Sequence, residues 1–229
     1  MTAMPRMFTA IALLVGAAVA PGANAAVTER GPIAPYLSSS PDAEIALARS
    51  AAPASVSSDA TVLVLTAAGY ETATKGSNGF TCLVDRSWGA DFDDPEFWNP
   101  KTRGPLCLNA AATRSVLPAL LQRAQWVLAG LSREELLQRT RAAVETKAIR
   151  APEAGAMCYM LSKDGYLNNA GGHWRPHLMF YLPRLEAAAW AANAKGGPVF
   201  GGPLMVEPTT VFIVEAPNWS DGSPGPMSH

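Results

Sequence analysis

The segment from Asp164 to Tyr181 (DGYLNNAGGHWRPHLMFY) is the most unusual part of the chain, because it gathers many groups that could do chemistry. It holds two of the three histidines, together with amide, aromatic and basic side chains. A loop of this composition between two expected strands is typical of a binding site. We therefore expect ligand contacts from five residues of the segment: His173, Trp174, Arg175, His177 and Tyr181.

Three kinds of function fit this segment. As a binding site, Trp174 would offer a flat apolar face and Arg175 a cationic fork to a small molecule or a cell-envelope component. As an exported hydrolase, the protein would use His177 or His173 as general base, with Asp164 as a candidate carboxylate. Cys158 and Ser162 are available as nucleophiles, but nothing in the sequence fixes them near either histidine, and the G-x-S-x-G pattern is absent. The third possibility is a structural or partner-binding protein whose Trp-rich loops form the interface.

The two histidines do not form a recognisable metal motif. Their spacing of four residues would place two imidazoles on one face of a helix. Pro176 lies between them, lacks an amide, and biases Arg175 toward an extended backbone. Four extended residues span about 13 Å, so only a curled loop would bring both rings to one ion. We expect no metal site and no cofactor.

An acidic stretch, residues 91–96 (DFDDPE), places four carboxylates close together. Calcium binds such oxygen-rich clusters, but the order and the glycine of an EF-hand are missing. The stretch is more typical of a solvated acidic loop.

Composition excludes several classes of protein. The chain of 229 residues carries 18 Lys+Arg and 19 Asp+Glu, a formal charge of −1. Such a charge gives no general attraction to nucleic acid. A hydrophobic content of 48% with balanced charge argues against a wholly disordered chain. Three cysteines are too few for a small disulfide scaffold.

The N-terminus has the three parts of a secretory signal. Arg6 provides the positive charge, residues 8–20 are apolar, and Ala23-Asn24-Ala25 is an A-x-A cleavage site. The apolar run is shorter than the about 20 residues that cross a bilayer. An N-terminal anchor or a buried helix is the alternative. We expect cleavage after Ala25, a secreted or periplasmic protein, and no membrane span after signal removal.

An oxidising compartment permits a disulfide. Cys82 and Cys107 flank a stretch rich in turn residues, and a bridge between them would contribute about 3.5 kcal/mol in the chain-entropy model. Cys158 lies in an apolar run and would then be a buried free thiol. Pairing of Cys158 with either of the others stays open, because spacing does not fix connectivity.

Apolar runs and turn residues predict the elements that hold these groups. A short helix should follow Ser40, and a helix from Asn109 to Gly130 should either kink at Pro118 or restart there. Ser132 and Glu135 predict a capping box that opens a helix to about Lys147. A further helix is expected from Pro183 through Trp190, ended by Gly196-Gly197. Residues 86–105 are expected as a long loop, and 201–203 as a turn. The expected strands are 61–66, 70–75, 80–85, 155–162, 178–182 and 209–215.

The strands come in groups with the longest helices between them. This order predicts an α+β fold, with a mainly antiparallel sheet and helices packed on one face, in a single compact domain. We expect four regions, listed by range: a cleaved signal (1–25), an irregular leader with one short helix (26–58), the α+β domain (59–217) and a disordered tail (218–229). Sheet topology, oligomeric state and the identity of any ligand do not follow from the sequence.

Overall fold

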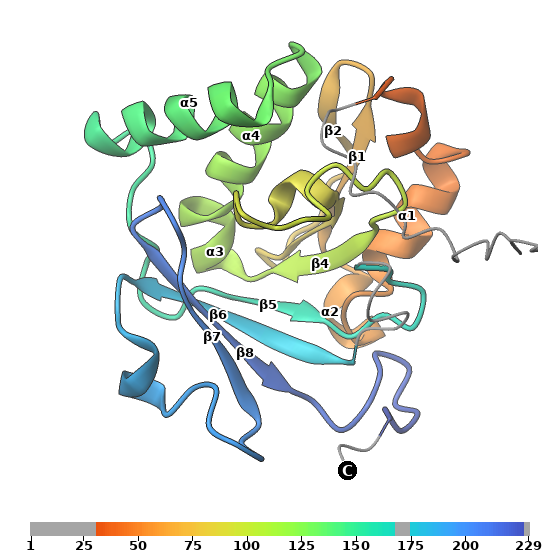
Figure 1. The fold of residues 1–229 in the computed structure, drawn as a ribbon. Helices are drawn as coiled ribbons and strands as arrows, with labels where there is room; N and C mark the ends of the chain where they lie inside the picture. The colour runs from red at the N-terminus through yellow and green to blue at the C-terminus, as the bar shows by residue number, and fades with distance from the viewer. Residues whose placement is uncertain (1–30, 168–174, 227–229) are drawn as a thin grey trace, which may run out of the picture.

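An eight-stranded sheet runs through the part of the chain that this computed structural model describes, residues 31–167 and 175–226 (Figure 1). Its strand order is β2-β1-β3-β4-β5-β6-β8-β7. Neighbouring strands pair antiparallel, except that β1 and β3 pair parallel. The strands are β1 (Thr61–Thr66), β2 (Gly69–Thr74), β3 (Thr81–Asp85), β4 (Gly104–Leu108), β5 (Met157–Met160), β6 (His177–Pro183), β7 (Val199–Pro203) and β8 (Thr209–Glu215).

Helices pack on both faces of this sheet. The α-helices are α1 (Pro41–Arg49), α2 (Ala54–Ser57), α3 (Ala110–Ser115), α4 (Leu117–Leu128) and α5 (Arg133–Glu145). Three short 3-10 helices are η1 (Ala34–Tyr36), η2 (Ser87–Gly89) and η3 (Ala187–Trp190). The α+β class, the mainly antiparallel sheet and the single compact domain are confirmed. The expectation that the helices pack on one face is wrong, because α1 and α3 pack on opposite faces of the sheet. The longer helices α4 and α5 lie together with α3, while α1 packs on the other side (Figure 1).

Alternation along the strands explains why both faces are covered, since successive side chains point to opposite sides of a sheet. Val62 of β1 packs in a buried cluster with Ala48 of α1. Its neighbour Leu63 packs in a different cluster with Leu83 and with Ala112 of α3. The strands β1, β3 and β4 are thus buried on both faces, which is why their sequences read as continuous apolar runs.

Two local sequence signals give the predicted helix boundaries. Pro118 starts a second helix rather than kinking one long helix, because α3 ends at Ser115 and α4 begins at Leu117. Ser132 and Glu135 form the predicted capping box at the start of α5. Both signals act within one helical turn, so they do not depend on the rest of the fold.

Three predicted elements are wrong in type. Residues 183–190 do not form a helix: Pro183 ends β6 opposite Thr209, and η3 covers only the last part. Residues 201–203 are not a turn but the end of β7, paired with β8. β4 lies inside the stretch predicted as a long loop. In each case pairing with a neighbouring strand overrides Gly and Pro signals that locally favour a turn or a helix start.

Both flanking regions pack against the sheet. Helix α1 contacts β1, β3 and β4 and buries Ala48, which places part of the expected leader in the folded unit. At the other end, Trp219 packs against the core and the Ser220 amide donates to the Leu161 carbonyl oxygen at 2.8 Å. Residues 218–226 therefore depart from the expected disordered tail.

The predicted disulfide is present. Cys82 and Cys107 are direct cross-strand neighbours on β3 and β4, and they are bonded to each other. Cys158 is a buried free cysteine, as expected. Within the described residues, none of the helices combines the length and the apolar character needed to cross a membrane.

Candidate functional site

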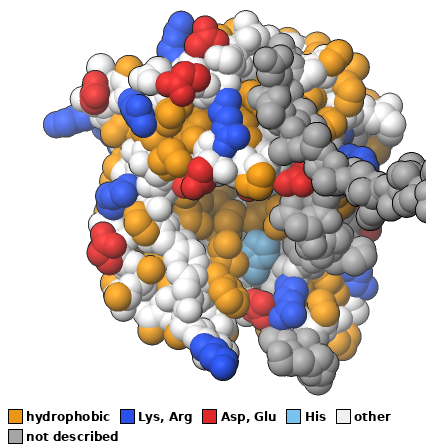
Figure 2. Space-filling view, viewed as in Figure 1, with side chains coloured by type: hydrophobic (Ala, Val, Ile, Leu, Met, Phe, Trp, Pro, Cys, Tyr) orange, Lys and Arg blue, Asp and Glu red, His pale blue; other side chains and the backbone are white. Residues whose placement is uncertain are grey.

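A cavity of about 490 Å³ opens between one face of the sheet and the elements packed above it. Strands β3 to β8 form its floor, and α3, α4 and the β3–β4 loop (residues 86–103) form the opposite side. Figure 2 shows the hollow, with hydrophobic side chains inside it. A volume of this size suits a small organic ligand, since binding pockets for such ligands span about 300–1,000 Å³.

The walls of the cavity are mainly apolar. On β4, β6 and β8, every second residue faces it, as the pleat of a sheet requires. The apolar side chains of the floor include Leu106 on β4, Met160 on β5, Met179 on β6, and Val211 and Ile213 on β8. Val116 and Leu120 face them from the helical side. Covering apolar surface that would otherwise contact water contributes about 25 cal/mol per Å². An apolar ligand that covers these side chains is therefore favoured.

His177 and Tyr181 bring two polar groups to this floor from β6. Both are 7% exposed. His177 Nδ1 lies 2.7 Å from the Arg175 carbonyl oxygen, so Nδ1 carries the proton and donates it. Burial lowers the pKa of His177, against the opposing effects of the Arg175 carbonyl oxygen and Glu215. The ring is therefore neutral at pH 7, with Nε2 as a hydrogen-bond acceptor.

Tyr181 is paired with the buried thiol. Its hydroxyl lies 3.3 Å from Cys158 Sγ. Burial raises the pKa of Tyr181 well above its ordinary range and raises that of Cys158 to about 12. Both groups therefore stay protonated at neutral pH. A thiol with this pKa is a poor nucleophile, because only the thiolate attacks.

Asp85, at the end of β3, places a carboxylate against the apolar cavity. Its Oδ1 accepts a hydrogen bond of 2.8 Å from the Arg86 amide. Its Oδ2 lies over Gly89, where a Cβ atom would be only 1.9 Å away. Glycine at position 89 thus makes room for the carboxylate. Burial raises the pKa of Asp85 to about 6, although the Arg86 amide and the guanidinium groups of Arg123 and Arg86 oppose this shift.

Two contacts tie the β3–β4 loop and α4 to the β7–β8 turn (residues 204–208) and so close one side of the cavity. Arg123 of α4 forms a buried ion pair with Glu207. It also donates to the carbonyl oxygens of Trp88 and Ala90, which fixes the start of the loop. Asp91 Oδ2 accepts a hydrogen bond of 2.9 Å from the Met205 amide.

The predicted site residues are brought together only in part. Of those in the described chain, His177 and Tyr181 line the cavity. Arg175 does not line it and instead pairs with Glu215, at 3.3 Å. Asp164 is exposed in a turn outside the cavity lining. His173 and Trp174 lie outside the described residues.

His177 and Asp85 lie on strands that are not neighbours in the sheet. Their strands, β6 and β3, are separated by β4 and β5. With neighbouring strands about 4.8 Å apart, about 14 Å of sheet lies between the two backbones. Asp85 and His177 thus stand at separate positions on the cavity floor, which suits contacts to two parts of one ligand better than joint proton transfer.

The acidic stretch 91–96 lies over the cavity rather than in an isolated solvated loop. Asp91, Asp94 and Glu96 all contribute to the lining. Within residues 31–167 and 175–226, no group of three or more His, Cys, Asp or Glu side chains is placed to hold a metal ion. The loop tryptophans Trp88 and Trp98 are each 1% exposed and belong to the core.

Sequence reasoning missed Asp85, Arg123 and Glu207. The sequence does carry a signal for Asp85: it lies two residues after the apolar Leu83 in the same strand, so both side chains face the same side of the sheet. For Arg123 the signal is weaker, namely a charged residue within an apolar helix. For Glu207 the sequence carries no signal, because its place in the cavity depends on the pairing of β7 with β8.

Comparisons with models of known protein families, with curated proteins and with solved structures find no match to this chain. Function is therefore inferred from the geometry and chemistry of the cavity.

Proposed function

We propose that this protein binds a small, mainly apolar molecule in the cavity between the sheet and α3–α4. The observation that carries the proposal is the cavity itself: about 490 Å³, with apolar walls and a few polar groups at defined positions. This combination is the usual form of a small-molecule site. Asp85, His177 and Tyr181 would orient the ligand, and the apolar residues would supply most of the affinity.

We also propose that the protein acts outside the cytoplasm. The signal-like features of residues 1–25 support export, and so does the disulfide between Cys82 and Cys107, because such bonds persist in oxidising compartments. A ligand from the cell envelope or its surroundings is consistent with this location. A hydrolase has less support, since Cys158 is held as a thiol and the His177 ring is far from the Asp85 strand.

Binding of N-phenyl-1-naphthylamine tests the proposal, because this neutral apolar dye becomes fluorescent in apolar surroundings. We expect saturable binding of one dye per chain. Gly104 lines the cavity, and a Cβ atom there would lie 3.7 Å from Met160 Cε and 3.8 Å from Asp85 Cβ. A leucine at this position would therefore fill ligand space, and Gly104→Leu should weaken dye binding at least tenfold.

Gly31→Leu is the matched control, because a Cβ atom at Gly31 would meet nothing within 4 Å. It adds the same side chain at an exposed site and should bind the dye like the wild type. Thermal melts of both variants check folding. Absence of saturable binding, or equal binding by a folded Gly104→Leu variant, would contradict the proposal.

A further inference from the structure

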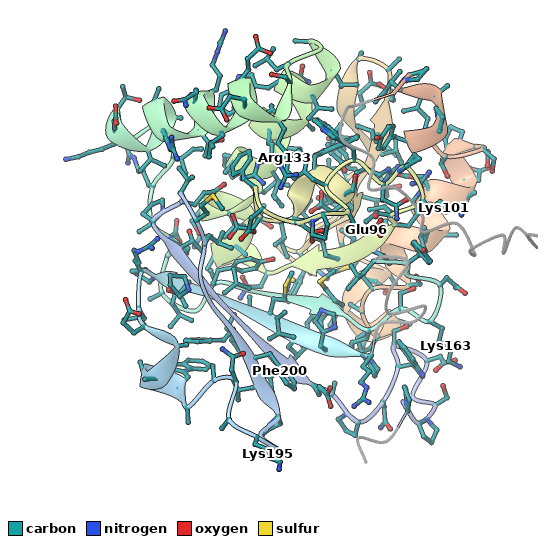
Figure 3. The ribbon with its side chains drawn as sticks, viewed as in Figure 1. Glu96, Lys101, Arg133, Lys163, Lys195 and Phe200 are labelled. Atoms are coloured by element: carbon teal, nitrogen blue, oxygen red, sulfur yellow. A yellow bond between two sulfur atoms is a disulfide. The ribbon has the colours of Figure 1, made fainter. Side chains whose placement is uncertain are left out.

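Carboxylates outnumber cations around the cavity. Five acidic side chains contribute to the described lining: Asp85, Asp91, Asp94, Glu96 and Glu207. Three guanidinium groups oppose them, which leaves a formal charge of −2 with His177 neutral. Figure 2 shows acidic side chains along the upper rim of the hollow. In Figure 3, Glu96 lies on the loop in the middle of the molecule, whereas Lys163 and Lys195 lie at its edge.

Two of the three guanidinium groups form ion pairs with carboxylates. Arg86 donates two hydrogen bonds to the Glu44 carboxylate, at 2.8 and 3.0 Å, and both side chains are buried. Arg123 is paired with Glu207. Arg150 is exposed, so solvent weakens its effect on the cavity.

Two cations that do not line the cavity, Arg133 and Arg175, also have partners. Arg133 donates to the Phe92 carbonyl oxygen and lies over the Phe97 ring. Arg175 is paired with Glu215. The formal charge of −2 is therefore that of the lining side chains themselves.

Asp85 is the lining carboxylate best placed to receive a cation. Its Oδ1 accepts a hydrogen bond from the Arg86 amide. The side chain is partly exposed and lines the cavity. A carboxylate has about four acceptor positions. Leu106 and Met160 of the apolar floor lie on the adjacent strands β4 and β5. A charged acceptor thus stands at one end of an apolar surface.

We propose that the ligand is a cationic amphiphile, whose ammonium group pairs with the Asp85 carboxylate while its apolar body lies along β4, β5, β6 and β8. This inference rests on the proposed function and names the chemical class of the ligand. An ammonium group neutralises a carboxylate that is costly to leave unpaired in apolar surroundings. Apolar walls keep water away and strengthen that attraction. An anionic amphiphile would meet an excess of like charge.

Competition with the bound dye tests the charge preference. The competitors are octylamine, 1-octanol and octanoate, which share one alkyl chain and differ in charge. The assay is run at pH 8, where octylamine is protonated and Asp85, with a pKa of about 6, is ionised. We expect octylamine to displace the dye at a concentration at least ten times lower than octanol, and octanoate to be the weakest competitor.

Asp85→Asn should remove this preference, so that octylamine and octanol displace the dye from this variant at equal concentrations. Asp164→Asn is the matched control, because it removes an exposed carboxylate outside the cavity and should leave the tenfold preference intact. Dye binding with equal displacement by the three competitors, or an unchanged preference in Asp85→Asn, would overturn this inference and leave the proposed function standing. Absence of dye binding would instead contradict the proposed function, and the inference with it.

Discussion

The carboxylate of Asp85 should lower the stability of the unliganded protein, and Asp85→Asn should restore it. Burial raises the pKa of this group from 3.8 to about 6. The folded state therefore holds the proton more tightly than the unfolded state, and stability falls as pH rises between these two values. Below about pH 3 both states are mostly protonated and the carboxylate costs almost nothing. By linkage the cost is about 1 kcal/mol at pH 4.5 and about 3 kcal/mol at pH 8. Asparagine keeps the shape of the protonated acid and an oxygen for the Arg86 amide, so it avoids the cost at every pH.

Urea unfolding followed by tryptophan fluorescence measures this difference in the free energy of unfolding. We expect Asp85→Asn to be more stable than the wild type by about 3 kcal/mol at pH 8 and by about 1 kcal/mol at pH 4.5. Asp93→Asn, which changes an exposed carboxylate, serves as the control and should show no such dependence on pH. The same gain at both pH values, or a loss of stability at pH 8, would refute the idea that the carboxylate is held in apolar surroundings at a cost.

Two further substitutions test the disulfide and the buried ion pair between Glu44 and Arg86. Replacing both cysteines of the disulfide, as Cys82→Ala with Cys107→Ala, should lower the free energy of unfolding by about 3.5 kcal/mol, because the unfolded chain regains the freedom of the loop between them. An unchanged urea midpoint would contradict this. Glu44→Ala should cost about 3–5 kcal/mol, because it leaves the fully buried Arg86 guanidinium without its carboxylate. Glu44→Gln keeps one acceptor and should cost less, and equal losses in the two variants would argue against a charge effect.

The elements that could be predicted from the sequence are those specified by nearby residues. The capping box of Ser132 and Glu135 lies within one turn, and the strand over residues 209–215 is a β-branched run that matches β8. The restart at Pro118 also follows from local chemistry, although the sequence could not decide between it and a kink. The disulfide needed only the expected compartment and the turn residues between Cys82 and Cys107.

What could not be predicted depends on partners far along the chain. β7 contains Gly201 and Gly202, which favour a turn, and it becomes a strand by pairing with β8. Residues 183–190 begin with a proline that suits a helix start, yet Pro183 is held in β6 opposite Thr209. The cavity follows the same logic, because its floor comes from strands on both sides of the helical segment α3–α5. His177 and Tyr181 were found by their unusual surroundings in sequence, whereas Asp85 required knowledge of what faces the end of its strand.

The order of the strands along the chain also decides when each cysteine can meet a partner, if the chain enters the oxidising compartment from its N-terminus. β3 and β4 are complete, with Cys82 and Cys107 opposite each other, before α3, α4 and α5 have emerged. Cys158 arrives only afterwards, on β5. Vectorial emergence thus favours the native bridge over either wrong pairing. The same order leaves the cavity floor unfinished until β6, β8 and β7 have joined, so a chain stopped before β6 would keep its disulfide and lack the wall that carries His177 and Tyr181.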